Sequence, residues 1–142
     1  MSKNFTSHSQ DESFEWAVEL GINANPGDTF ALIGDLGCGK TIIAKGIAKG
    51  LKINEEITSP TFTLLEIYEE GRLPFYHFDL YRIEDDREFD NLYFEEYWEA
   101  EGISVIEWAD KAKNRIPVKS TIITIEYTGE STRSITIEYP GN

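Results

Sequence analysis

The chain has 142 residues, of which 26 are Asp or Glu and 13 are Lys or Arg, so its formal net charge is -13. This length suits one domain, residues 1–142, and excludes separate motor and substrate domains, while a hydrophobic content of 40% excludes a disordered chain. The negative charge argues against tight direct binding to nucleic acid or to an anionic membrane surface.

The N-terminus and the overall hydropathy bear on where the protein acts. The first ten residues lack the apolar core of an export signal, and no run approaches the roughly 20 apolar residues of a membrane span. A single cysteine, Cys38, fits a reducing compartment. We therefore expect a cytoplasmic protein without membrane contact.

The first third of the chain predicts a helix, a strand and a second helix. Ser9 and Glu12 have capping-box spacing, and an apolar stripe at helical spacing follows them to about Gly21. The apolar run 29–33 predicts a short buried strand, and apolar residues recur at helical spacing from Thr41 onward. A glycine-rich segment joins this strand to the second helix.

The remaining sequence predicts two hairpins, an acidic helix and a buried strand. Residues 61–69 and 74–82 form the first expected hairpin, and residues 121–127 and 134–139 form the second. Between them we expect a helix over 86–100 and a buried strand over 103–106 that ends at Glu107. The fold class predicted is α/β, a single P-loop NTPase-like domain with a mixed, mostly central β-sheet flanked by helices.

The glycine-rich segment is the strongest functional signal. Its sequence, Gly34-Asp35-Leu36-Gly37-Cys38-Gly39-Lys40-Thr41, fits the pattern G-x-x-x-x-G-K-[ST] between a predicted strand and a predicted helix. Glycines let the backbone N–H groups of such a loop surround phosphate oxygens at a helix N-terminus. Lys40 is then expected to reach the β- and γ-phosphates, and Thr41 to give its hydroxyl oxygen to Mg²⁺.

Two carboxylates at predicted strand ends are candidates for holding that Mg²⁺. Glu107 ends the apolar run 103–106, and Asp79 ends the more aromatic run 75–78. We favour Glu107 for the metal and leave a second role to Asp79; either could instead be a solvated carboxylate or a helix cap. His77 lies two residues before Asp79 on the same side of its strand, where it either packs in the core or hydrogen-bonds this carboxylate.

Four blocks together closely resemble the TsaE (YjeE) family, the ATPase component of bacterial tRNA threonylcarbamoyladenosine biosynthesis. They are the glycine loop, Ser59-Pro60-Thr61-Phe62, His77-Phe78-Asp79-Leu80-Tyr81-Arg82 and Ile106-Glu107-Trp108, in the family's order and spacing. The resemblance implies weak ATP hydrolysis with Mg²⁺. It also implies association with TsaB and TsaD, of which TsaD performs the threonylcarbamoyl transfer to the adenosine beside the anticodon of tRNA.

The same resemblance suggests roles for individual residues. Residues 59–62 resemble a switch-type loop whose Thr61 approaches the nucleotide, and Asp79 resembles a catalytic or magnesium-linked carboxylate. Glu107 resembles the family's magnesium-associated glutamate. Ser13 stands where the family tends to have threonine near the base, and Arg133 either approaches phosphate or is solvated. Two positions depart from the commonest pattern: Cys38 replaces alanine, and Ile42 replaces a second threonine.

Other functions remain open at this stage. A small-molecule P-loop kinase would use the same loop, but it needs a lid with arginines, and no arginine cluster occurs among the 13 basic residues. A GTPase would need an N-K-x-D motif, which the sequence lacks. A pure scaffold would need neither Lys40 nor Asp79.

Overall fold

The computed structural model describes residues 2–35, 37, 39–60, 62–112 and 114–140. Seven strands form one mixed sheet in the order β1-β7-β6-β2-β5-β4-β3. The strands are β1 (Ser2–Ser7), β2 (Thr29–Gly34), β3 (Leu65–Tyr68), β4 (Phe75–Asp79), β5 (Ile103–Glu107), β6 (Thr121–Tyr127) and β7 (Arg133–Glu138). The central strands β6, β2, β5 and β4 are parallel, and β1, β7 and β3 pair antiparallel at the two sides. The prediction of a mixed α/β sheet is confirmed.

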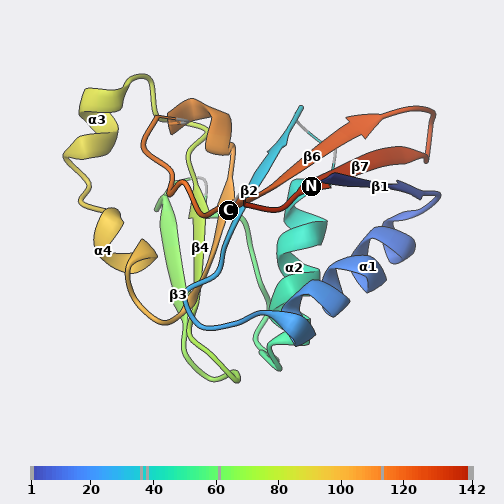
Figure 1. Cartoon of the computed structure of the whole chain (residues 1–142), viewed down its shortest axis with the longest axis horizontal. Coiled ribbons are helices and arrows are strands. Elements are labelled where there is room, and N and C mark those ends of the chain that lie inside the picture. Colours follow the sequence, from blue (N-terminus) through green and yellow to red (C-terminus); the bar gives the residue numbers. More distant parts are fainter. Residues whose placement is uncertain (1, 36, 38, 61, 113, 141–142) are drawn as a thin grey trace.

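The helices lie on the two faces of this sheet, as Figure 1 shows. One face is covered by α1 (Gln10–Asn23) and α2 (Lys40–Gly50). The other face is covered by the short helices α3 (Asp86–Asp90) and α4 (Glu95–Trp98) and by a 3-10 turn, η1 (Ala109–Ala112). Alternation along the strands divides the core accordingly: Phe30 and Leu32 of β2 face α1 and α2, whereas Ala31 faces the other side.

The two long helices approach each other very closely. A Cβ added at Gly46 of α2 would lie 2.5 Å from Ala17 Cβ and 2.7 Å from the Phe14 carbonyl oxygen, both on α1. Gly21 and Gly50 form a second close approach between the same helices. Because neither helix can move without breaking these contacts, they hold the N-terminus of α2, and with it the glycine loop, in place.

The acidic segment departs from the prediction of one helix over 86–100. It forms α3 and α4, separated by a turn in which Tyr93 has a φ of 55°. The rings of Phe89, Phe94 and Trp98 are buried together, at centroid distances of 5.4 Å for Phe89 to Trp98 and 5.8 Å for Phe89 to Phe94. A continuous helix would turn residues five apart to different faces, so burial of all three rings breaks the helix.

Two further segments differ from the expected elements. The strand β1 was not predicted because its sequence is polar; it is an exposed edge strand whose Phe5 ring stacks on Trp16 at 5.8 Å. Of the predicted strand 61–69, the described residues 62–69 form a strand over Leu65–Tyr68, after Leu64 at a φ of 69°. In contrast, the C-terminal hairpin and the Ser9 cap, which accepts a hydrogen bond from the Glu12 amide, are confirmed. Within the described residues, we find no helix with the length and apolar character needed to span a bilayer.

Candidate functional site

The glycine loop connects the end of β2 at Gly34 to the start of α2 at Lys40. Gly37 and Gly39 have φ values of 78° and 113°, which L-residues with a side chain rarely adopt. Gly39 is the N-cap of α2 and provides no side-chain hydrogen bond to the first turn, and an added Cβ there would meet no described atom within 4 Å. The first turn of α2 thus receives no side-chain cap from Gly39, and Gly39, Lys40 and Thr41 line a pocket. A helix N-terminus of this kind suits an anion. Two predicted loop residues, Leu36 and Cys38, lie outside the described residues.

Lys40 is held against this loop. Its side chain is only 4% exposed, and Nζ donates hydrogen bonds to the carbonyl oxygens of Gly34 at 2.6 Å and Asp35 at 2.9 Å. The ammonium also lies 3.8 Å from the centroid of the Trp108 ring, which gives Trp108 a contact with the site as well as with Tyr81 at 4.9 Å. Asp35 takes part through its backbone, since its side chain is exposed.

The two predicted carboxylates meet at the carboxyl ends of β4 and β5. Asp79 and Glu107 are direct partners in the parallel ladder, and each is 2% exposed. Glu107 accepts a hydrogen bond from the Thr41 hydroxyl at 3.0 Å and one from His77 Nε2 at 2.5 Å. The interpretation that His77 supports Asp79 is thus wrong, because its ring crosses to the neighbouring strand and contacts Glu107.

Asp79 has a different set of partners. Its carboxylate accepts a hydrogen bond from Ser59 Oγ at 2.8 Å and one from the Tyr81 amide at 2.9 Å. Ser59 belongs to the predicted switch-type loop, so this loop is tied to a strand-end carboxylate. Thr61, the loop residue expected to approach the nucleotide, lies outside the described residues. Glu107 is therefore linked to the glycine loop's helix, and Asp79 to the segment 59–62.

These side chains line one pocket. It is lined by Lys40, Thr41, Ser59, Asp79, Glu107 and Trp108, together with Gln10, Tyr81 and parts of the glycine loop. Hydroxyl and carboxylate oxygens are the ligands that Mg²⁺ prefers, and the uncapped helix N-terminus and Lys40 suit phosphate oxygens. The residues present therefore fit a magnesium–triphosphate group, with Thr41, Glu107 and Asp79 as the candidate metal contacts.

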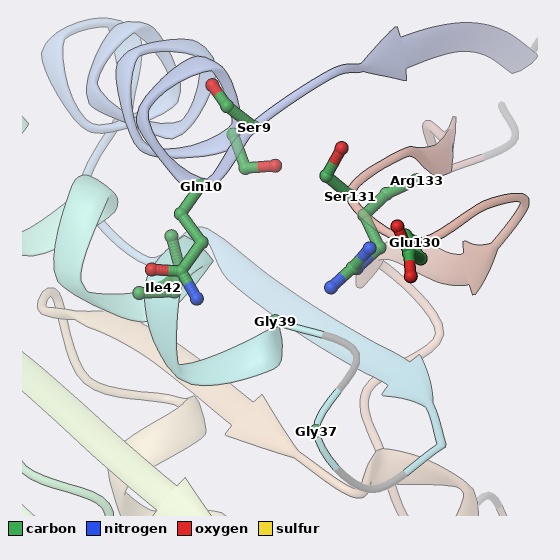
Figure 2. Close-up of a pocket in the computed structure, with 9 residues that line it drawn as sticks. Ser9, Gln10, Gly37, Gly39, Ile42, Glu130, Ser131 and Arg133 are labelled. Atoms are coloured by element: carbon green, nitrogen blue, oxygen red, sulfur yellow. The ribbon is translucent and has the colours of Figure 1, made fainter.

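A second pocket adjoins the first across Gly37, Gly39, Gln10 and Ile42. Figure 2 shows Arg133 of the β6–β7 hairpin across this second pocket from Gln10 and Ile42, with Gly37 and Gly39 below them in the view. The Arg133 guanidinium lies 4.0 Å from the Tyr127 ring, and the Tyr127 hydroxyl donates a hydrogen bond to the Gly37 carbonyl. The hairpin is thus attached to the glycine loop.

Ser13, expected near the base, lines this second pocket. It is 6% exposed, and its hydroxyl is already hydrogen-bonded to the Ser7 hydroxyl at 2.6 Å. Gln10 and Tyr81 line the site and were not predicted from the sequence. The Ser9 cap locates Gln10 at the start of a helix, but no local pattern indicates that this helix end lies beside the glycine loop.

The structure is an α/β domain with a mixed central sheet, and it joins a central parallel strand to a helix through the segment whose sequence fits the pattern G-x-x-x-x-G-K-[ST]. Lys40 and Thr41 begin this helix, and Glu107 lies at the tip of the adjacent strand. Comparison with known proteins identifies the family. The model of the family described as threonylcarbamoyl adenosine biosynthesis protein TsaE matches residues 7–135. The chain belongs to the TsaE family.

Relatives and a solved structure agree with this family. The TsaE protein of Bacillus subtilis is 43% identical over 119 residues, covering 84% of this chain and 74% of the relative. The TsaE protein of Treponema pallidum is 37% identical over 131 residues, covering 92% of this chain and 96% of the relative. The crystal structure of YdiB from Bacillus subtilis superposes with a TM-score of 0.88 at 33% identity, covering all of this chain and 88% of that one.

Proposed function

We propose that residues 1–142 form one ATPase domain that binds ATP with Mg²⁺ and hydrolyses it slowly. The observation that carries this proposal is the hydrogen bond between Thr41 of α2 and the buried Glu107 of β5, beside the uncapped helix N-terminus. Thr41 donates its hydrogen to Glu107, so its oxygen lone pairs remain for a cation. The phosphate-binding residues would be Gly34, Asp35, Leu36, Gly37, Cys38, Gly39, Lys40 and Thr41, with Ser13 toward the base.

The two carboxylates would divide the remaining work. Glu107 accepts a hydrogen bond from Thr41, so both residues would contact the metal ion. Asp79 is bonded to Ser59 in the loop that contains Thr61, and this connection favours a role in hydrolysis with a secondary part at the metal. Mg²⁺, when bound, would neutralise charge between the phosphates. Lys40 would hold the β- and γ-phosphates.

The family description and the relatives' names support a role in the biosynthesis of threonylcarbamoyladenosine in tRNA. We place this chain as a component that acts on the protein partners TsaB and TsaD, not on RNA. Its net charge of -13 supports a role without direct RNA binding, because tRNA is a polyanion and is repelled by a negatively charged protein. We expect filter binding to give no submicromolar affinity for tRNA at physiological salt.

Nucleotide binding is tested by calorimetric titration with ATP and ADP in Mg²⁺. Lys40→Ala removes a charge-assisted contact and should weaken binding by about 100-fold. Lys49→Ala is the matched control, since Lys49 is an exposed lysine on the same helix. Unchanged affinity in a folded Lys40→Ala variant would refute the assignment.

Metal titrations of turnover test the division between the carboxylates. Glu107→Gln should raise the Mg²⁺ concentration needed for half-maximal turnover, whereas Asp79→Asn should mainly lower turnover at saturating metal. Both substitutions keep side-chain size and change only charge and hydrogen bonding. If both variants lost only metal affinity, the proposed division would be wrong.

Steady-state phosphate release across a titration of TsaB and TsaD tests the link to partners. The glycine loop contains no arginine to neutralise charge in the transition state, so the isolated chain should be slow. Partner binding should raise kcat more than it lowers the KM for ATP, because the missing help is specific to the transition state. Equal turnover with and without the pair would contradict activation by partners.

A further inference from the structure

His77 is a polar side chain in a place that usually holds an apolar one. It lies on β4 two residues after Phe75, on the sheet face that carries α1 and α2, and it is 0% exposed. Its Nε2 is 2.5 Å from Glu107 Oε2. Its Nδ1 is buried and has no hydrogen-bond partner among the described residues. Burying an imidazole ring costs stability, and the contact of Nε2 with Glu107 is the polar interaction that offsets part of this cost.

The contact with Glu107 determines which atom donates. An ionised carboxylate can only accept hydrogen bonds, so Nε2 of His77 carries the hydrogen and donates it. The other oxygen of the same carboxylate, Oε1, accepts the hydrogen bond from Thr41. Glu107 is therefore held at both oxygens, by β4 on one side and by the first turn of α2 on the other.

This arrangement makes a chain of two hydrogen bonds from the core to the glycine loop. With Oε2 fixed by His77, the Glu107 carboxylate cannot rotate away from Thr41. Thr41 must then direct its hydrogen toward Glu107, which leaves its oxygen lone pairs for a cation. Groups that orient metal ligands in this manner commonly change metal affinity by about 10- to 100-fold when they are removed.

We propose that His77 is a positioning residue of the cation site, acting through Glu107 on the orientation of Thr41. The inference rests on the proposed binding of ATP with Mg²⁺. It states that His77 is needed for Mg²⁺ to strengthen the binding of the nucleotide. His77 contacts neither the metal nor the phosphates. Its removal should weaken nucleotide binding in the presence of Mg²⁺ and leave metal-free binding almost unchanged.

The deciding comparison is between His77→Gln and His77→Asn. The amide nitrogen of Gln lies as many bonds from Cβ as Nε2 of His, whereas that of Asn lies one bond closer to the backbone and falls short of Glu107. The measured quantity is the dissociation constant of a non-hydrolysable ATP analogue in EDTA divided by its dissociation constant in Mg²⁺. We expect His77→Asn to lower this ratio about 10-fold and His77→Gln to keep it within about threefold of wild type.

Phe75→Leu is the matched control, since Phe75 is buried on the same strand and the same face. It should reduce thermal stability without changing the ratio. Should His77→Asn fail to fold, His77→Phe removes the same donor with a ring of similar size, and it should also lower the ratio about 10-fold. A merely structural role would change both dissociation constants together and leave the ratio constant, and that result would overturn the inference.

The experiment separates this inference from the proposed function. If the wild-type protein does not bind the analogue, or binds it equally with and without Mg²⁺, the proposed function fails and the inference fails with it. If wild-type binding is enhanced by Mg²⁺ and the Asn and Phe variants retain the full enhancement, only the role of His77 is refuted. Loss of the enhancement in His77→Gln as well would also refute it, because that variant keeps the donor.

Discussion

On one face of the sheet α1 and α2 pack backbone against backbone, whereas on the other face α3 and α4 contribute aromatic rings. The first contact depends on missing side chains at Gly21, Gly46 and Gly50. The second depends on large ones, with Phe89, Phe94 and Trp98 buried against Phe78 of β4. Both faces add to stability, but only the close-packed face contains the helix that begins at the glycine loop.

This difference indicates that the two faces respond differently to substitution. A helix locked through its backbone transmits any displacement to its ends, because a close-packed contact cannot absorb an added atom. An aromatic cluster formed by two short helices loses buried area when a ring is removed, without moving the strands beneath it. Substitutions on the aromatic face should therefore lower stability alone, whereas substitutions between α1 and α2 should lower both stability and nucleotide affinity.

The largest expected effect is the loss of stability in Phe89→Ala. Phe89 is 0% exposed and stacks on Trp98, so truncation should lower the free energy of unfolding by about 3–5 kcal/mol. Urea denaturation measures this change. Tyr93→Ala is the control in the same segment, since Tyr93 is 69% exposed and should change the free energy by less than about 0.5 kcal/mol. ATP affinity of folded Phe89→Ala should match wild type, and a large loss there would break the comparison.

A smaller loss of stability, accompanied by a loss of affinity, is expected for Gly46→Ala. The added methyl collides with Ala17 Cβ and the Phe14 carbonyl, and overpacking of this kind costs about 1–3 kcal/mol. The higher helix propensity of alanine offsets about 1 kcal/mol of that cost. Because α2 must shift, ATP affinity measured by calorimetry should fall as well.

Gly129→Ala is the matched glycine control for this variant. Gly129 lies in the β6–β7 turn, and its nearest atoms to an added Cβ are those of Thr132 at 3.5 Å, an ordinary contact. Its stability and ATP affinity should both stay at the wild-type level. Loss of stability without loss of affinity in Gly46→Ala would show that α2 does not transmit the displacement to the glycine loop.

The smallest expected effect concerns an exposed ion pair on the aromatic face. Arg115 donates two hydrogen bonds to Asp90 of α3, at 2.7 Å and 3.1 Å, and this contact lowers the pKa of the Asp90 carboxyl. A pKa that is lower in the folded state adds stability above the ordinary aspartate pKa of about 3.9, and this stability is lost as the pH falls through the folded-state pKa.

Arg115→Met tests this pH dependence. Its melting temperature should lie slightly below wild type at neutral pH, and the difference should shrink toward zero at acidic pH and in high salt. ATP affinity should not change, since neither residue lines the two pockets beside the glycine loop. If the melting temperature of Arg115→Met still lay below that of wild type at pH 2, Arg115 would stabilise through packing and not through its charge.

Local patterns in the sequence were enough to predict the glycine loop and its flanking elements. The helix cap at Ser9, the strand before Gly34 and the helix from Lys40 follow from hydrophobic periodicity and from the conformations that glycine allows. The two carboxylates could be named as candidates because each ends an apolar strand. The edge strand β1 could not be predicted, because it pairs with β7 through backbone hydrogen bonds and its polar side chains show no hydrophobic pattern.

The sequence by itself determined a loop suited to phosphate, with a lysine and a threonine at the start of a helix. Only the tertiary structure decided that Thr41 and His77 meet at Glu107 and that Ser59 meets Asp79. It also decided that Gln10 and Arg133 line the pockets beside the loop. These contacts join residues far apart in the chain, so they depend on strand order and on the register of β4 against β5. No local pattern specifies that pairing, because it follows from how the whole sheet buries its two faces.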